Sequence, residues 1–427
     1  MSNGSAQFAA LAKTVMAQCD ELAAISSKQG RLDRYYLTPE HRECSNRLTE
    51  FMEAAGMVVW EDAVGNLWGR YAAKPTEGRS SRSLIMGSHH DSVPNAGRYD
   101  GPLGVLSAIA AVAYLHDLGE RLPFHVDVVA FGDEEGARFG TTLLGSQPVA
   151  GHWKPEWWDL CDKEGVSLRQ AFEQFGLNPS RIQECALDPR SLLGYLELHI
   201  EQGPVLEAGD HPLGVVTGIA GARRFEVRIL GKAGHAGTVP MNMRRDALLG
   251  ASEANLAVER IAKDMGVVAT VGQIEARPGA VNVIPGEVTL SLDIRAMGDA
   301  TRDAALERMR SSIGASCTKR GLEAKWEETH SAASVSCAPW LQKCQAEVLE
   351  SMHLEPVHLP SGAGHDAMAM AQLTDTGMFF TRCADGLSHH PEESVLTEDV
   401  AYGIEAMARL LFKLTDLVND ENKVVVA

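Results

Sequence analysis

Four short segments of the chain concentrate histidine and carboxylate side chains, the groups that bind divalent metals and transfer protons. They read SHHDSVPNAGRYDG at 88–101, DEEG at 133–136, HIEQG at 199–203 and SHHPEE at 388–393. An isolated histidine after a strand is most often a structural residue, so no single segment identifies a site. Together, imidazole and carboxylate ligands without thiolates suit Zn, Mn, Co or Ni, and a carboxylate that bridges two ions would make a two-metal hydrolytic site.

Glu134 and Glu135 are adjacent in the second of these segments. Neighbouring side chains in an extended segment point to opposite sides. One carboxylate can therefore bind metal while the other faces the attacking water as a general base.

A short apolar run, typical of a strand, precedes or contains each segment. The four runs are 83–87, 125–132, 194–200 and 377–383. A helical pattern at 103–118 separates the first two, which indicates a right-handed parallel crossover. Because ligands bind beyond the carboxyl ends of parallel strands, the four segments should converge on one crevice of a mostly parallel α/β sheet.

The stretch 214–330 has a different pattern. Alternating segments typical of strands and two long helical segments follow one another there, at 223–230, 244–265, 267–276, 287–296 and 299–321. This order predicts an inserted α+β domain with its helices on one face of an antiparallel sheet. We therefore expect a catalytic metal-binding domain built from 1–213 and 331–427, interrupted by an inserted domain at 214–330.

The overall composition excludes several classes of function. The 427 residues include 39 Lys and Arg against 57 Asp and Glu, a formal charge of -18 that would repel nucleic acid. No apolar run approaches the roughly 20 residues of a membrane span, and the N-terminus lacks the basic region of a secretory signal. Eight scattered cysteines without a CxxC pair favour reduced thiols in the cytoplasm.

The motifs resemble a known family. SHHDS, GRYDG, DEEG, LHIEQGP, GHAGTVPM, SGAGHDAM and GLSHHPEE, in this order around an inserted domain, resemble the hydantoinase/carbamoylase branch of the M20 metallopeptidase-like amidohydrolases. The resemblance runs from about Leu37 to the C-terminal helix. Other M20 peptidases usually carry a carboxylate where this chain has His199, which favours the amidohydrolase branch.

The resemblance implies a centre of two divalent ions, Zn or Mn with Co or Ni as alternatives, bridged by Asp100. The implied metal ligands are His89, Asp100, Glu135, His199 and His389. His89 and His199 would complete one ion site, and Glu135 with His389 the other. His90 and His390, the second histidine of each HH pair, are interpreted as non-ligands.

The resemblance also implies the catalytic roles. Glu134 would be the general base, and Asp91 would orient His89. His235 would donate to the oxyanion of the tetrahedral intermediate. The implied substrate contacts are Gln202, His235, Asn282, Arg295 and Gly364. Arg295 can hold a carboxylate with two parallel hydrogen bonds.

The predicted activity is hydrolysis of a ureido or carbamoyl C–N bond in a small carboxylated substrate, with release of ammonia. YYLTPEH and SGAGHDAMAMA favour allantoate over an N-carbamoyl-L-amino acid. The alternatives are an M20-type aminopeptidase or dipeptidase and a non-catalytic binding protein of the same fold, which would be expected to lack Glu134 or a ligand. The resemblance further implies a homodimer through the inserted domain, which would close on the metal domain as a lid.

Overall fold

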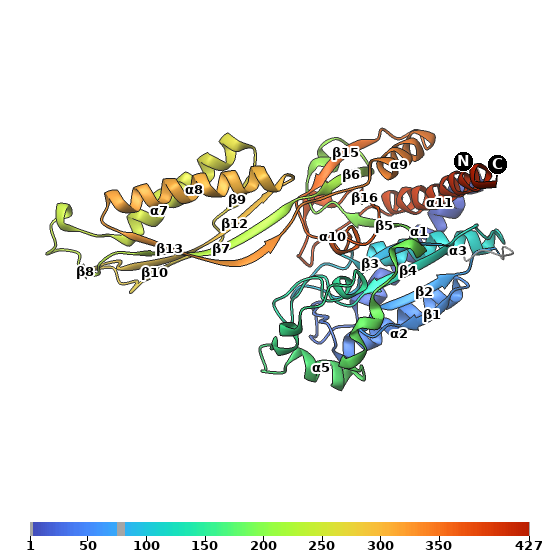
Figure 1. The fold of residues 1–427 in the computed structure, drawn as a ribbon, viewed down its shortest axis with the longest axis horizontal. Helices are drawn as coiled ribbons and strands as arrows, with labels where there is room; N and C mark the ends of the chain where they lie inside the picture. Colours follow the sequence, from blue (N-terminus) through green and yellow to red (C-terminus); the bar gives the residue numbers. More distant parts are fainter. Residues whose placement is uncertain (1–2, 75–81, 427) are drawn as a thin grey trace. The chain divides into compact units, whose positions relative to one another are not determined.

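The computed structural model describes residues 3–74 and 82–426 (Figure 1). The chain divides into two compact units. The first comprises Met1–Thr217, Cys337–Leu359 and His365–Ala427, and the second comprises Gly218–Ser336 and Pro360–Gly364.

The centre of the first unit is a parallel sheet. Its four central strands, in spatial order, are β4 (His125–Phe131), β3 (Ser83–His89), β5 (Leu192–Ile200) and β16 (Thr376–Thr381), and each pairs with its neighbour in parallel. All seven residues of β3 are buried, as expected for a strand covered on both faces. The four strands expected to share one sheet are thus neighbours in it, which confirms the predicted fold class.

Further strands extend this sheet to nine strands within the described residues. They are β1 (Val58–Glu61), β2 (Leu67–Tyr71), β6 (Leu213–Ile219), β14 (Val335–Ser336) and β15 (Val357–Ser361). The β2–β4, β1–β2, β16–β6 and β14–β6 pairs are antiparallel, so the parallel core has antiparallel flanks.

Helices of the first unit pack on this sheet and on one another. The longer ones are α1 (Asn3–Ala23), α2 (Pro39–Ala54), α3 (Pro102–Asp117), α5 (Leu168–Phe175), α9 (Pro339–Ser351) and α11 (Thr397–Val426). Short turns of helix are α4 (Ser146–Val149), α6 (Val205–Ala208) and α10 (Ala367–Met370). Helix α3 lies between the sheet and the pair α1 and α11, which explains why it is buried nearly all round.

Three tryptophans lie in the segment between β4 and β5. Trp153 and Trp158 pack edge-on against Phe172 and tilted against each other, and Trp157 packs edge-on against Trp153. They belong to a separate apolar cluster with α5. This packing indicates a structural role for the three tryptophans.

The second unit is an antiparallel sheet with two helices. Its strands are β7 (Gly221–Leu230), β9 (Val268–Thr270), β10 (Ile274–Arg277), β12 (Glu287–Ala296) and β13 (Glu323–Ala332). Helices α7 (Ala247–Met265) and α8 (Asp299–Lys319) lie along one face (Figure 1). Alternate residues of β12, from Val288 to Ile294, are buried in their shared core. This is the α+β arrangement expected from the alternating pattern.

Two features of this unit differ from the expected pattern. Strand β13 was not anticipated, because Trp326 is its only large apolar side chain and its alternation is weak. Positions 214 and 330, the expected boundaries, lie within strands β6 and β13. Because Gly214 pairs with β16, it belongs to the first sheet, and β13 continues its pairing with β7 to Ala332.

A short ribbon pairs β8 (Gly234–His235) with β11 (Val283–Ile284). Within the described residues, no helix combines the length and apolar character needed to cross a membrane.

Candidate metal centre

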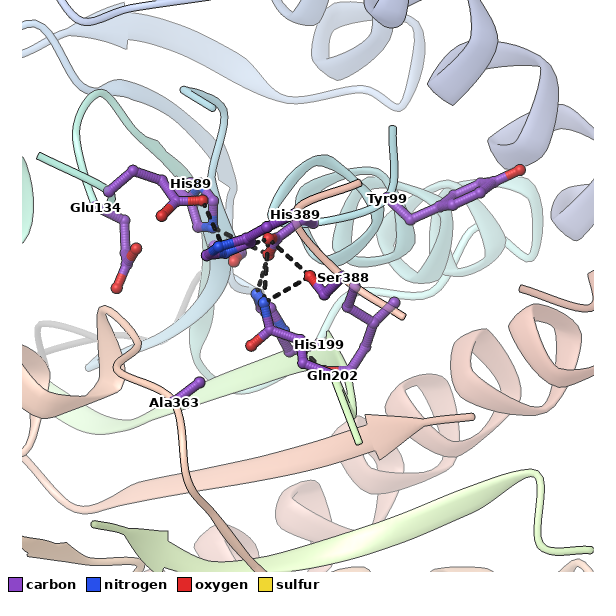
Figure 2. A network of polar contacts seen from close by, with 12 residues as sticks. His89, Tyr99, Glu134, His199, Gln202, Ala363, Ser388 and His389 are labelled. Atoms are coloured by element: carbon purple, nitrogen blue, oxygen red, sulfur yellow. Dashed lines mark hydrogen bonds and ion pairs between the residues drawn. The ribbon is translucent and has the colours of Figure 1, made fainter. Parts of the chain in front are cut away.

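The histidine and carboxylate segments meet at one edge of the parallel sheet. His89 is the last residue of β3, His199 lies near the end of β5, and Glu134 and Glu135 follow β4. His389 follows β16 on a loop. Since parallel strands present their carboxyl ends on the same side, His89, His199 and His389 lie close together there (Figure 2).

Asp100 occupies the centre of this arrangement, just before α3. Its Oδ1 lies 3.2 Å from His199 Nε2 and 3.8 Å from His89 Nε2. Its Oδ2 lies 3.1 Å from His389 Nε2, and that nitrogen is 3.5 Å from Glu135 Oε1. One carboxylate therefore links two groups of side chains, one through each oxygen.

These two groups fit metal ions. Ligand atoms of His89, Asp100 and His199 lie within 4.8 Å of one another, as do those of Asp100, Glu135 and His389. The donors are nitrogen and oxygen only, a set that suits Zn or Mn. All five residues expected to bind metal are in these groups, and the shared member is Asp100.

A glycine allows the approach of helix α3 to this centre. Gly101 has φ +84°, and a Cβ added there would lie 2.5 Å from the His89 ring. Any larger residue would displace the imidazole, so the DG pair places Asp100 beside His89.

The buried carboxylates have strongly perturbed acidity. Burial, followed by the charge of Glu135, raises the pKa of Glu134 well above its ordinary value. Burial and the charge of Asp100 raise the pKa of Glu135 to about 7. The contact with Asp100 raises the pKa of His389 to about 9. Such crowding of acidic groups in one buried site is typical of functional sites, and bound cations would relieve it.

Asp91 connects two of the strand ends. Its Oδ1 lies 3.2 Å from His89 Nδ1, which leaves His89 Nε2 to face Asp100. The backbone N–H groups of Glu134 and Glu135 donate to its two oxygens, at 3.0 and 3.2 Å. Asp91 thus orients one expected ligand and fixes the turn that carries the paired glutamates.

Comparison with known proteins agrees with this geometry. The model of peptidase family M20/M25/M40 matches residues 85–413. The chain belongs to this family.

The relatives of this M20 chain include amidohydrolases. It is 40% identical to the allantoate deiminase of Arabidopsis thaliana, over 95% of this chain and 82% of the relative. It is 38% identical to the N-carbamoyl-L-amino acid amidohydrolase of Geobacillus stearothermophilus, over 90% and 94%. A solved amidase of the hydantoinase/carbamoylase family from Burkholderia multivorans is 32% identical with a TM-score of 0.86, covering 94% of this chain and 97% of that one. The predicted family and branch are confirmed.

The second histidine of each HH pair in this M20 chain lies outside the two ligand groups. His90 is buried, its Nδ1 lies 2.8 Å from the Phe131 carbonyl oxygen, and its ring packs edge-on against His41. His390 is half exposed, and its Nδ1 accepts the backbone N–H of Glu392. The interpretation of both as non-ligands stays a prediction.

Gln202, expected to contact substrate, is engaged with the centre itself. Its Nε2 donates to Asp100 Oδ2 at 3.0 Å and to Ser388 Oγ at 2.9 Å (Figure 2). The backbone of Gln202, like that of His389, has φ +56°, a strained conformation for either residue. The structure therefore places Gln202 beside the expected bridging carboxylate.

The remaining expected substrate residues belong to the second unit. The β8–β11 ribbon places His235 opposite Val283, and the backbone N–H of Ala236 donates to the carbonyl oxygen of Asn282. His235 and Asn282 are exposed, as is Gly364.

Arg295 lies on the open face of β12, in a pocket of about 860 Å³ that Arg224 and Asp293 also line. Its Nε and Nη2 donate to Asp293 at 2.9 and 2.8 Å, and its Nη1 donates to the Gly362 carbonyl oxygen at 2.6 Å. Arg224 Nε donates to the same Asp293 carboxylate at 3.0 Å.

Sequence reasoning missed several buried residues around the centre. Glu197, His199 and His365 form a further group with ligand atoms within 4.8 Å of one another. Glu197 accepts hydrogen bonds from Ser88 and Tyr195, at 2.7 and 3.0 Å. Its position two residues before His199 on one strand was a usable signal, because residues i and i+2 share a face. His365 directly follows the SGAG segment that drew attention only to Gly364.

Proposed function

We propose that this chain is a metal-dependent amidohydrolase that cleaves a ureido or carbamoyl C–N bond of a small carboxylated substrate and releases ammonia. The observation that carries the proposal is Asp100, whose two oxygens face separate groups of nitrogen and oxygen ligands. The relatives named allantoate deiminase and N-carbamoyl-L-amino acid amidohydrolase support the type of bond.

The proposed ligands are His89, Asp100, Glu135, His199 and His389, holding two divalent ions, Zn or Mn with Co or Ni as alternatives. Divalent ions in such a site polarise the scissile carbonyl and increase the acidity of water.

Glu134 is the proposed general base. It is buried, and it lies with His89 and Glu135 in one cluster of possible ligand atoms. It would take a proton from the attacking water and deliver it to the leaving nitrogen. Asp91 keeps His89 in the tautomer whose Nε2 faces Asp100.

Arg295 is proposed to bind the substrate carboxylate. A guanidinium has five N–H donors, and three are used on Asp293 and Gly362, so two remain on the Nη atoms. Asp293 already holds the plane of the group, which reduces the entropy lost on binding. Asn282, Gly364 and Gln202 would add neutral contacts, and His235 would donate to the oxyanion.

Allantoate is the first candidate substrate. Three relatives named allantoate deiminase and one named probable allantoate deiminase are 38–41% identical to this chain. Three N-carbamoyl-L-amino acid amidohydrolases are 37–38% identical to it. The decisive experiment measures ammonia release by metal-stripped protein reloaded with Mn, Zn, Co or Ni. Allantoate, N-carbamoyl-L-amino acids, N-carbamoyl-β-alanine and a dipeptide form the substrate panel. Cleavage of the dipeptide alone would replace the proposal with a peptidase.

A homodimer through the second unit, with that unit acting as a lid, is part of the proposal. Leu249 and Leu256 on α7 are 42% and 67% exposed, and Met241 and Met243 are 70% and 72% exposed. Leu249 and Leu256 are seven positions apart and so share one face of α7, and exposed apolar side chains on one face are typical of an interface. Light scattering of the wild type and a Leu256→Glu variant would test it. A cytoplasmic location stays a prediction, to be checked by cell fractionation.

A further inference from the structure

A buried carboxylate outside the proposed ligand set joins the two loops that carry Asp100 and His389. Glu393 is 3% exposed, and its Oε1 accepts the backbone N–H groups of Tyr99 and Asp100 at 2.8 and 3.1 Å. It forms no ion pair with lysine or arginine within 3–74 and 82–426. Its hydrogen bonds therefore hold the backbone of the Asp100 loop, at the N-terminal end of α3.

The Asp100 loop is shaped around this carboxylate. A Cβ added at Gly97 would lie 2.3 Å from the carboxyl carbon and Oε1 of Glu393. Only glycine at this position leaves room for the carboxylate against the loop backbone. The contact is thus built into both segments.

Ser388 links the other oxygen of Glu393 to the centre. Ser388 Oγ lies 3.2 Å from Glu393 Oε2 and 3.2 Å from Asp100 Oδ2, and it accepts a hydrogen bond from Gln202. A hydroxyl has one proton, so Ser388 donates to one carboxylate at a time. Glu393 gives this proton an alternative acceptor when Asp100 Oδ2 is otherwise engaged.

We propose that Glu393 is a positioning residue, which ties the Asp100 loop to the His389 loop and holds the two side chains at the spacing that a shared cation requires. The inference rests on the proposed metal centre. Groups that orient metal ligands from outside typically change metal affinity by about 10- to 100-fold when removed. Loss of Glu393 frees two backbone donors and one hydroxyl at once, so we expect a change within that range.

The test compares metal affinity across a set of variants. Metal-stripped wild type, Glu393→Ala, Glu393→Gln and Glu392→Gln are titrated with Mn²⁺ and Zn²⁺ by calorimetry, and bound metal is counted by elemental analysis. Glu392 is the matched control, since it is the adjacent residue with the same charge and its side chain is 83% exposed. We expect weakening of about 10- to 100-fold in Glu393→Ala, a smaller loss in Glu393→Gln, which keeps one acceptor oxygen, and no change in Glu392→Gln.

Each outcome decides one question. Wild-type affinity in a folded Glu393→Ala protein would overturn the positioning role while leaving the proposed function intact. Absence of metal binding by the wild type would instead remove the proposed function. If Glu393→Ala does not fold, Glu393→Gln decides: weaker binding than in Glu392→Gln supports the role, and equal binding rejects it. Unfolding of the metal-free proteins separates this effect from a general loss of stability.

Discussion

The proposed metal centre and the proposed substrate contacts differ in how the chain holds them. Asp100 and His199 are nearly fully buried, and Asp91 is fixed by backbone donors from another strand end. In the second unit, His235 and Asn282 lie exposed on a two-residue ribbon. Buried, multiply bonded ligands are pre-organised, whereas exposed residues with few contacts lose more conformational entropy when they bind a substrate. The proposed chemistry therefore depends mainly on pre-organised residues of the first unit, whereas the proposed recognition depends partly on exposed residues of the second.

The first prediction, with the largest expected effect, tests the proposed metal centre by substitution of the paired glutamates. Glu134→Gln should keep both metals and lose about 100- to 10,000-fold in turnover, since it removes only the proton acceptor. Glu135→Gln should lose metal instead, because its carboxylate faces His389. Turnover and elemental analysis on the same samples separate the two roles. A fully active Glu134→Gln enzyme would end the assignment.

Sequence reasoning succeeded best where chemistry and strand ends coincide. The segments that carry the five expected ligands could be found because they follow or end apolar strands, the family resemblance supplied the individual ligands, and the structure brings them together. Glu393 and Ser388 could not be found in this way. Glu393 contacts backbone N–H groups nearly 300 positions away in the chain, and backbone donors leave no residue pattern. Ser388 acts through side chains that are also distant in the sequence, those of Asp100 and Gln202.

In the second unit, periodicity identified the helices and the central strands but not the ion pairs. Arg295 was expected to be a cation available to substrate. In the structure, Asp293 on the same face of β12 already accepts two of its hydrogen bonds. The i, i+2 spacing in SLDIRA was visible in the sequence. The sequence did not reveal that Arg224, on the neighbouring strand, shares this carboxylate.

The second prediction tests recognition by Arg295. Arg295→Ala should weaken binding of a carboxylate substrate by about 10- to 150-fold, the value of a charge-assisted hydrogen bond. Arg295→Lys should rescue it only partly, because an ammonium lacks the planar two-point contact. The measurement is kcat/KM for an acid and its neutral amide. If the mutant keeps the wild-type preference for the acid, the carboxylate binds elsewhere, and Arg224 is the next residue to change.

The third prediction concerns pH and the first unit. Burial, with added repulsion from Arg42 and Arg34, lowers the pKa of His41 to about 3, and its ring packs against His90 and Phe175. The unfolded chain binds a proton at this histidine below about pH 6.5, and the folded chain does not. Stability is therefore complete above about pH 6.5 and falls as the pH falls toward 3.

At pH 5, protonation of this histidine in the unfolded chain alone lowers the free energy of unfolding by about 2 kcal/mol relative to neutral pH. Denaturant unfolding of metal-free protein at pH 7.5 and 5 measures it. His41→Gln, whose amide oxygen can still accept the Leu37 N–H, should show a smaller pH dependence although it is less stable at both values. An unchanged pH dependence in the variant would show that other groups cause the acid sensitivity.

The smallest effect is expected from an ion pair on the second unit. Arg320, followed by the hydroxyl of Ser316, lowers the pKa of Glu253 to about 2. A carboxylate with a depressed pKa adds stability that is present above about pH 4.5 and lost as the pH falls toward 2. The Glu253 and Arg320 side chains are 41% and 33% exposed, however, so water and salt screen the pair. Glu253→Gln should then cost less than about 1 kcal/mol at pH 7, and raising the salt concentration should shrink the difference. A loss of unfolding free energy as large as the one predicted for His41 at pH 5 would mean that the second unit also depends on desolvated charge. The two units would then differ in exposure alone.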